Sequence, residues 1–320
     1  MAERGPGREQ AGGPFPPVPQ VGTRGGRRAG LLARWGPQLT LAPALGLLGG
    51  IFLAAFAYTV ALSLSAWLLL RPELPRAYVG LRNFQDLVSD PRVWTALRNT
   101  LAFALPAVAL EFLAGLALAL LLQREPRGAA FFKSVLLIPL MVAPVVTGFT
   151  WAFMLHLDFG PLPQLFRALG LATLGATPVL ASRALVMPAL VLVDAWISTP
   201  FMMLVLLAGL QAIPPEPYEA AAVDGASARQ RFLLITLPLL RPAILVALLI
   251  RTINAVNFFD VAFIMTGGGP GTASEVLALF NYRVTFGDFD LGYGAAVSLF
   301  VLVVSAAVSL SYIRTLQRAS

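Results

Sequence analysis

The sequence consists of six long apolar stretches separated by shorter polar ones. Each apolar stretch is at least as long as the roughly 20 residues that a helix needs to cross the hydrocarbon core of a bilayer. None of them alternates between apolar and polar positions, as the strands of a membrane β-barrel would. The pattern therefore predicts an all-α, polytopic membrane protein. Its six transmembrane helices are expected at about residues 44–70, 95–122, 133–156, 184–210, 239–265 and 292–312.

The composition supports a membrane protein and excludes several kinds of site. Hydrophobic residues make up 58% of the chain and charged residues only 12%, whereas a soluble domain carries about 25% charged residues. The absence of cysteine excludes disulfides, and the single histidine, His156, excludes a multi-histidine metal site. The single lysine, Lys133, follows Phe132, so the Gly-Lys pair of an ATP-binding P-loop is missing. We therefore expect no cofactor and no metal, and any ATP hydrolysis must occur in a partner chain.

The distribution of charge orients the predicted helices. The formal net charge is +7, and the basic residues flank the apolar stretches, which indicates a membrane protein and no nucleic-acid partner. Residues 1–37 are rich in Gly, Pro and Arg and have no apolar period, so they are predicted to form a disordered, basic tail ahead of a membrane domain at 38–316. Because basic residues favour the cytoplasmic side, both termini and the polar interval 214–242 are predicted to be cytoplasmic.

The polar interval at residues 214–242 is too polar to lie in lipid and is organised as short helices. Tyr218 to Ala222 favours a helix, and Pro217 is placed to start it. Asp224-Gly225 predicts a turn, and Ser227 can cap a second short helix. On spacing alone, this interval could be an ordinary charged loop.

The residues of this interval resemble a known motif. The EAA loop in the membrane subunits of ABC importers is similar at Glu219-Ala220-Ala221, Asp224-Gly225-Ala226, Phe232, Ile235, Leu237-Pro238 and Pro242. The resemblance implies that residues 214–238 form a coupling loop whose helix docks in a cleft of a cytoplasmic ATPase. By the same resemblance, Glu219 makes a charged contact, Ala220, Ala221 and Ala226 allow close approach, and Asp224 and Gly225 form the turn.

The fifth apolar stretch carries a series of polar residues. Arg251, Asn254, Asn257 and Asp260 recur every three residues, which would place them along one face of a helix. So many polar groups do not face lipid. They could line a path for a hydrophilic solute, with Phe258 or Phe259 available to stack on a sugar and Ser298 of the last stretch facing the same path.

A second interpretation of this stretch is structural. Arg251 could pair with an intramembrane acid on another helix, such as Glu111 or Asp194. Asp194 itself could line the path, or it could bond a helix end that Pro200 frees. The two interpretations can hold at different levels of one helix.

The segment that follows carries a further resemblance. The sequence FFDVAFIMTGGGPGTAS at residues 258–274 is similar to the corresponding segment of maltose-, trehalose- and glycerol-phosphate-type permeases. In that family the helix before the glycine-rich turn lines the translocation path. Phe258 stands where some relatives carry a second Asn, so the resemblance does not define the exact sugar contacts here. The glycines at 267–269 are expected to form a flexible break in chain direction.

The resemblance covers about residues 39–316 and implies a function. The chain would be the permease subunit, not an enzyme, of an ATP-driven, binding-protein-dependent sugar importer in a bacterial or archaeal cell membrane. Its partners would be a second related permease subunit, a dimer of ABC ATPases and an external solute-binding protein. The alternatives are a permease for glycerol phosphate or another polar solute, a secondary transporter that uses Glu111, Asp194 and Asp260 as ion sites, and a scaffold that transports nothing.

Overall fold

The computed structural model describes residues 28–71, 73, 76–124 and 128–317. The first part of the predicted tail, residues 1–27, therefore lies outside the described residues. The chain through Phe56 forms a unit of its own, and the chain from Ala57 onward forms a second, compact unit. Residues 28–56 belong to the first unit, and the core and the candidate site described below belong to the second.

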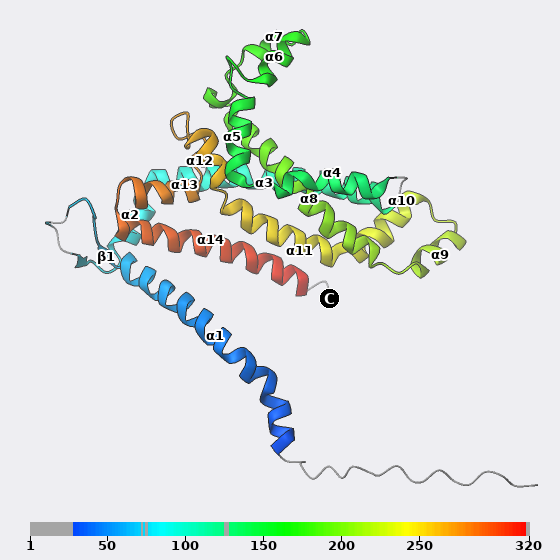
Figure 1. Ribbon diagram of the computed structural model, residues 1–320, viewed down its shortest axis with the longest axis horizontal. Coiled ribbons are helices and arrows are strands. Elements are labelled where there is room, and N and C mark those ends of the chain that lie inside the picture. Colours follow the sequence, from blue (N-terminus) through cyan, green and yellow to red (C-terminus); the bar gives the residue numbers. More distant parts are fainter. Residues whose placement is uncertain (1–27, 72, 74–75, 125–127, 318–320) are drawn as a thin grey trace, which may run out of the picture. The chain divides into compact units, whose positions relative to one another are not determined.

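The described chain is almost entirely helical, as predicted, with one small antiparallel strand pair in which Ser65 lies opposite Tyr78 (Figure 1). The helices are α1 (Arg28–Ser63), α2 (Arg82–Ser89), α3 (Pro91–Gln123), α4 (Ala129–Met141), α5 (Pro144–Met154), α6 (Pro161–Ala168), α7 (Ala172–Ala176), η1 (Val179–Ala181), α8 (Val186–Gln211), α9 (Glu216–Val223), α10 (Ala228–Arg231), η2 (Phe232–Thr236), α11 (Leu237–Val256), α12 (Asp260–Thr266), α13 (Leu277–Tyr282), η3 (Arg283–Gly287) and α14 (Leu291–Gln317); the strands are β1 (Ser65–Ala66) and β2 (Ala77–Tyr78).

In the described part of the chain, five helical stretches are long and apolar enough to cross a membrane. They are Leu41–Ser63, Pro91–Gln123, Val186–Gln211, Ala228–Val256 and Leu291–Thr315. A sixth crossing is available if the pair α4 and α5, which is bent by 93°, counts as one span. The predicted all-α class is confirmed, and the six predicted stretches correspond to these six elements.

The structure differs from the predicted helix bounds near the N-terminus. Residues 28–37, which were expected to belong to the disordered tail, are helical in α1. At the other end α1 stops at Ser63, although the apolar pattern continues to residue 70. The Asn83 side chain donates hydrogen bonds to the carbonyls of Ser63 and Ser65 at 2.8 and 2.9 Å. These bonds hold the chain in the extended form of β1, which hydropathy cannot reveal.

Two further predicted helices are interrupted. The third stretch, 133–156, breaks between α4 and α5 at Val142-Ala143, where Pro144 starts a new helix in a different direction. The fifth stretch, 239–265, breaks between Val256 and Asp260. Its helix also starts earlier than predicted, because α10, η2 and α11 run without a gap from Ala228. Proline and polar residues within apolar runs mark these breaks, but their extent depends on tertiary contacts.

The core lies where α3, α8 and α11 pack against one another. Gly115 of α3 makes a close approach possible, since a Cβ there would lie 2.8 Å from the Cβ of Met202 on α8. A small residue at such a contact lets two helices approach backbone to backbone, which is how membrane helices commonly associate. The contact brings together the middles of α3 and α8, where the charged residues discussed below lie.

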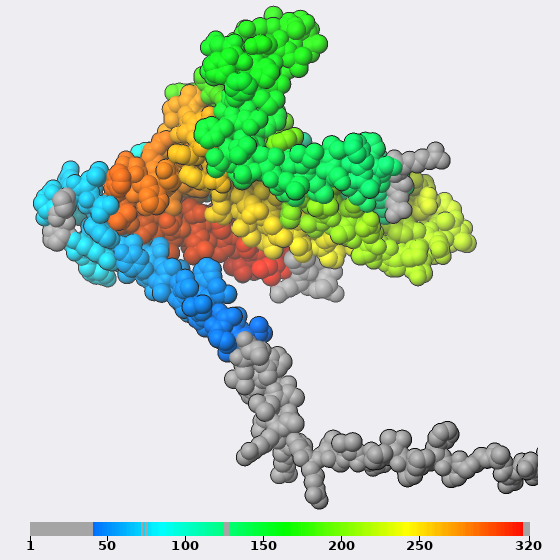
Figure 2. Space-filling model, in the orientation of Figure 1, coloured from blue at the N-terminus to red at the C-terminus, as the bar shows by residue number. Residues whose placement is uncertain are grey.

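Much of the second unit's surface is apolar. Large side chains on α4 and α5, such as Phe131, Met141 and Phe149, are exposed. In Figure 2, α4 and α5 lie within the green region of the visible face. Apolar surface of this extent suits contact with lipid or with another membrane subunit.

Candidate functional site

The coupling loop predicted from the sequence is a pair of short helices, α9 and α10, joined by a tight turn. Pro215 lies just before α9 and Pro217 in its first turn, where a missing N–H costs nothing. The same turn contains Glu216 and Glu219, which favour the positive end of the helix dipole. The predicted helix is therefore present, and it begins at Glu216, one residue ahead of Pro217.

The turn after α9 is a hydrogen-bonded helix stop that requires Gly225. The Ala226 N–H donates to Ala221 O at 2.9 Å and the Gly225 N–H donates to Ala222 O at 3.2 Å. This pair of bonds is the Schellman motif, whose penultimate residue adopts the left-handed conformation. Gly225 has φ of +73°, and a Cβ added there would meet no atom within 4 Å. Glycine is thus required because of the backbone conformation, and not because a side chain would clash with a neighbour.

The second helix, α10, starts with a capping box. The Ser227 side chain accepts from the Gln230 N–H, while the Gln230 side chain accepts from the Ser227 N–H at 2.8 Å. This arrangement satisfies N–H groups that the first turn leaves free, so it fixes where the helix begins. The predicted cap at Ser227 is confirmed. The helix then continues through the π-helical turn η2 into α11.

The residues predicted to touch an ATPase are accessible. Glu219, Ala220, Asp224 and Gly225 are exposed, and Ala221 and Ala226 are half-buried. Sequence reasoning overlooked Val223, whose side chain is 88% exposed at the last position of α9. A large apolar side chain left in water at the end of a short helix suits a contact with another chain. Its only signal in the sequence is its place inside the EAA-like motif.

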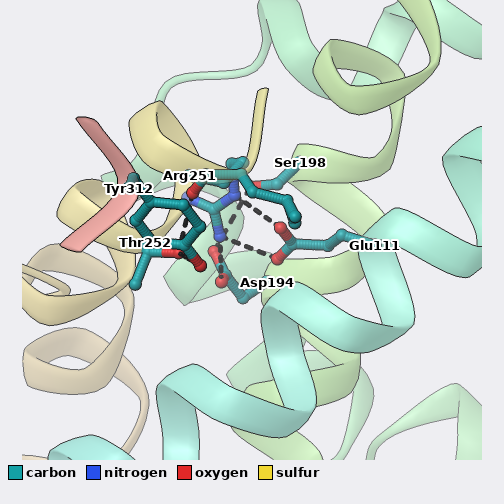
Figure 3. A network of polar contacts seen from close by, with 7 residues as sticks. Glu111, Asp194, Ser198, Arg251, Thr252 and Tyr312 are labelled. Carbon is teal, nitrogen blue, oxygen red and sulfur yellow. Dashed lines mark hydrogen bonds and ion pairs between the residues drawn. The ribbon is translucent and has the colours of Figure 1, made fainter. Parts of the chain in front are cut away.

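A buried charge triad, defined as Glu111, Asp194 and Arg251, links α3, α8 and α11 (Figure 3). Arg251 Nε donates to Glu111 Oε2 at 2.5 Å and its Nη2 donates to Glu111 Oε1 at 2.7 Å. The same Nη2 donates to Asp194 Oδ2 at 2.6 Å. Glu111 is 0% exposed, and Asp194 and Arg251 are each 5% exposed. Arg251 therefore pairs with intramembrane acids on other helices, as the structural interpretation predicts. It contacts both candidate acids, Glu111 and Asp194.

The groups around the triad are polar as well. The Ser198 hydroxyl donates to Asp194 Oδ1 at 3.4 Å, and beside Arg251 the hydroxyls of Thr252 and Tyr312 lie 3.1 Å apart (Figure 3). Buried charges are retained only where partners satisfy them, because desolvation of an unpaired charge is costly. The triad thus fixes α3, α8 and α11 to one another at the centre of the core.

The residues predicted to line a solute path do not lie on one continuous helix. Asn254 belongs to α11, Asn257 is its C-cap, and Asp260 is the first residue of α12. All three side chains are exposed, unlike Arg251. Asn257 Nδ2 donates to Ile253 O at 2.8 Å and to Ser305 Oγ at 3.3 Å. The break between α11 and α12 therefore presents a cluster of accessible polar groups.

The other two predicted path residues are engaged within the protein. Phe258 is 9% exposed, and its ring stacks on Phe103 at a centroid distance of 4.0 Å. Ser298 is half-buried, donates to Gly294 O at 3.0 Å and accepts from Asn281 Nδ2 at 2.9 Å. Both residues therefore support neighbouring elements, whereas Asn254, Asn257 and Asp260 remain accessible.

The glycine-rich turn after α12 is held by polar contacts on both sides. Ser274 Oγ donates to Gly269 O at 2.7 Å, and Asn99 of α3 donates to Thr272 O at 2.8 Å. Glu275 is buried and pairs with Arg283 at 2.5 Å. The turn redirects the chain as predicted, but these bonds fix it in place where flexibility was expected.

A family model matches residues 111–318, which include the buried charge triad, the coupling loop and α14. Its description is binding-protein-dependent transport system inner membrane component. The match covers more than half of the chain and contains both parts of the candidate site.

Individual relatives match over most of the chain. It is 41% identical to the trehalose/maltose transport system permease protein MalF of Thermococcus litoralis, over 73% of this chain and 78% of the relative. It is 37% identical to the sulfoquinovosyl glycerol transport system permease protein SmoG of Agrobacterium fabrum, over 87% and 89%. It is 33% identical to the trehalose transport system permease protein SugA of Mycobacterium tuberculosis, over 86% and 87%.

A solved structure shares the fold. The match is to a chain of a bacterial ABC transporter involved in the import of the acidic polysaccharide alginate, with a TM-score of 0.75 at 21% sequence identity. It covers 91% of this chain and 99% of the other. At this identity the likeness concerns the arrangement of helices alone.

Proposed function

Because the chain belongs to the family of inner membrane components of binding-protein-dependent transport systems, we propose that it is the subunit through which a sugar or oligosaccharide enters the cell. The protein is a multi-pass permease subunit of an ABC importer and leaves ATP hydrolysis to a separate chain. The observation that carries the choice of solute is the 41% identity to a trehalose/maltose permease. The proposal therefore names an α-linked disaccharide as the first solute to test.

The solute contacts in this proposal are the accessible polar groups at the α11–α12 break. Amide and carboxylate side chains offer the donors and acceptors that a sugar's hydroxyls need. Asn254, Asn257 and Asp260 meet this requirement because their side chains are exposed. Phe258 and Ser298 support these contacts indirectly, since both side chains are packed against other residues of the chain.

In the proposed complex, α9 docks on the cytoplasmic ATPase. Two ATPase copies serve this chain and a second, related permease subunit, and a solute-binding protein delivers the sugar on the external side. Both termini and the coupling loop lie in the cytoplasm of a bacterial or archaeal cell. ATP binding closes the ATPase dimer, which moves the docked helices and turns the permease pair from inward- to outward-facing.

Transport can be measured directly. The chain is reconstituted in proteoliposomes with the permease, ATPase and binding protein from its own gene cluster, and uptake of labelled trehalose and maltose is followed with and without ATP. We expect ATP-dependent uptake that unlabelled disaccharide inhibits and glycerol phosphate does not. Inhibition by glycerol phosphate instead would move the solute class to polyol phosphates. Uptake that survives without ATP but stops when the proton gradient is dissipated would identify a secondary transporter and refute the proposal.

The docking of α9 is tested by co-purification. Glu219→Lys is expected to release the ATPase, because it reverses a charge that lies exposed on the docking helix. Glu216→Lys is a matched control, since Glu216 is an exposed acid in the same first turn but outside the EAA-like motif. Retention of the ATPase by the Glu219→Lys variant would remove Glu219 from the interface.

A further inference from the structure

The coupling helix α9 has one polar side-chain contact with the rest of the described chain. The hydroxyl of Tyr218 lies 2.9 Å from the hydroxyl of Thr236. In the part of the chain that the structure describes, no other α9 side chain makes a hydrogen bond or an ion pair, and none is fully buried. Figure 2 shows the yellow-green segment that contains α9 at one end of the second unit's visible face. The Tyr218–Thr236 contact is therefore the side-chain hydrogen bond that connects α9 to the start of α11 in the described chain.

The partner of Tyr218 lies at a special point of the backbone. Thr236 is the last residue of η2, the π-helical turn that leads directly into α11. A π-turn is a rare irregularity in a helix and is frequently found at functional sites. Thr236 is buried, and its hydroxyl also donates to Arg231 O at 3.4 Å. Either hydroxyl can donate in the 2.9 Å contact between the two side chains, because each carries one proton and also accepts.

Thr236 is the N-cap of α11, the helix that carries both the arginine of the buried charge triad and proposed solute contacts. α11 contains Arg251, which binds Glu111 of α3 and Asp194 of α8, and it ends at the exposed Asn254 and Asn257. A displacement of α11 along its axis therefore acts on the core contacts and on the proposed solute contacts together.

We propose that the Tyr218–Thr236 hydrogen bond transmits the movement of α9 to α11. Tyr218 and Thr236 are positioning residues in this proposal, because neither touches solute or ATP. Glu219 holds the ATPase, and the adjacent Tyr218 passes its movement through the π-turn to the membrane helix. The inference rests on the proposed function, since it requires an ATPase docked at α9.

The experiment uses the reconstituted importer with Tyr218→Phe and Thr236→Val, which remove one hydroxyl each and conserve shape. Three quantities are measured: ATPase retained on the purified complex, ATP hydrolysis stimulated by the sugar-loaded binding protein, and sugar molecules moved per ATP. We expect full retention of the ATPase and a fall in sugar moved per ATP of about threefold or more in each variant. The double variant should fall no further than either single one, because the two residues share one bond.

Controls separate this effect from a general loss of packing. Thr236→Ser keeps the hydroxyl and should restore the native ratio of sugar to ATP. Tyr312→Phe and Thr252→Val remove a bond of the same chemistry between α14 and α11, remote from α9. These two variants should transport with the native ratio.

Other outcomes overturn the proposal in distinguishable ways. A native ratio in both Tyr218→Phe and Thr236→Val, or an additive loss in the double variant, overturns the transmission role alone. Loss of the bound ATPase in Tyr218→Phe places Tyr218 in docking instead and also overturns it. A native complex that binds no ATPase overturns the proposed function, and the transmission role with it.

Discussion

Arg251 of α11 and Glu111 of α3 meet through two parallel contacts, with Nε 2.5 Å from Oε2 and Nη2 2.7 Å from Oε1. The planar guanidinium matches a carboxylate in this fork, which gives the pair a fixed geometry that lysine could not reproduce. Asp194 takes part through Nη2 of the same arginine. Three helices are thus joined by a single cationic side chain.

Removal of this cation should destabilise the protein strongly. Arg251→Met leaves two buried acids without their partner, and we expect the free energy of unfolding to fall by about 3–5 kcal/mol. The loss is measured by thermal unfolding of the purified complex in detergent. Arg241→Met is the control, because Arg241 is an exposed arginine of the same helix, and it should change the free energy of unfolding by less than about 0.5 kcal/mol.

The same prediction has a compensating variant. Combining Arg251→Met with Glu111→Gln and Asp194→Asn removes all three charges, and it should recover a substantial part of the stability lost by Arg251→Met alone. Equal melting temperatures for Arg251→Met and Arg241→Met would show that the contacts carry little of the fold's stability.

Substitution of Gly115 should separate α3 from α8. A Cβ at this position would lie 2.8 Å from Met202 Cβ and 3.0 Å from the backbone N of Met203, so neither side can yield easily. We expect Gly115→Ala to cost about 1–3 kcal/mol of stability. Ala109→Val adds more bulk on an exposed position of α3 and should melt at the native temperature. A native melting temperature for Gly115→Ala would mean that the helices can move apart without loss.

Gly225 should tolerate asparagine better than alanine. Its φ of +73° is unfavourable for most side chains, and no neighbouring atom limits the space. We expect Gly225→Ala to destabilise the turn by about 1 kcal/mol and to weaken ATPase binding. Gly225→Asn should retain more of the ATPase binding, because asparagine tolerates the left-handed conformation better than alanine does. Gly170, with φ of +78° and no atom within 4 Å, provides the control. Gly170→Ala has the same local cost and should leave ATPase binding in pull-down assays unchanged.

Asn257 should affect solute handling more than ATPase docking. Asn257→Ala removes an exposed amide at the α11–α12 break, and we expect the sugar concentration for half-maximal transport to rise by roughly 3–10-fold. Ser305→Ala removes only the side-chain partner of Asn257 and should have a smaller effect. Uptake measured over a range of sugar concentrations checks both. An unchanged concentration dependence in Asn257→Ala would exclude this amide from the path.

The local structure of the coupling loop could be predicted because its signals are short-range. Pro217, Gly225 and Ser227 each act on the backbone within a few residues, so the sequence alone places the two helices and the turn. The contact between Tyr218 and Thr236 could not be predicted in the same way. It depends on how the chain folds back after the turn and on the π-helical form of η2, neither of which has a periodic signal.

The polar core was only partly predictable. The cost of intramembrane charge identified Arg251, Glu111 and Asp194 as partners, yet the sequence left open which acid Arg251 binds. The spacing of three also suggested one polar face through Asp260, whereas the helix ends at Val256. Asn257 and Asp260 are polar residues at that break, but hydropathy does not show where the helix ends. Tertiary packing, such as Phe258 on Phe103, decides where the helix stops.

The buried charge triad also bears on the order in which the protein is assembled. Synthesis proceeds from the N-terminus, so the helices with Glu111 and Asp194 leave the ribosome before the helix with Arg251. Until that helix arrives, both acids are without their cation, at a cost of about 2.5–3.5 kcal/mol for a charge in the middle of the bilayer. The arrival of α11 supplies the cation for both acids. A nascent chain truncated before residue 251 therefore lacks the contact that joins its helices, and it should be a preferred target for membrane proteolysis.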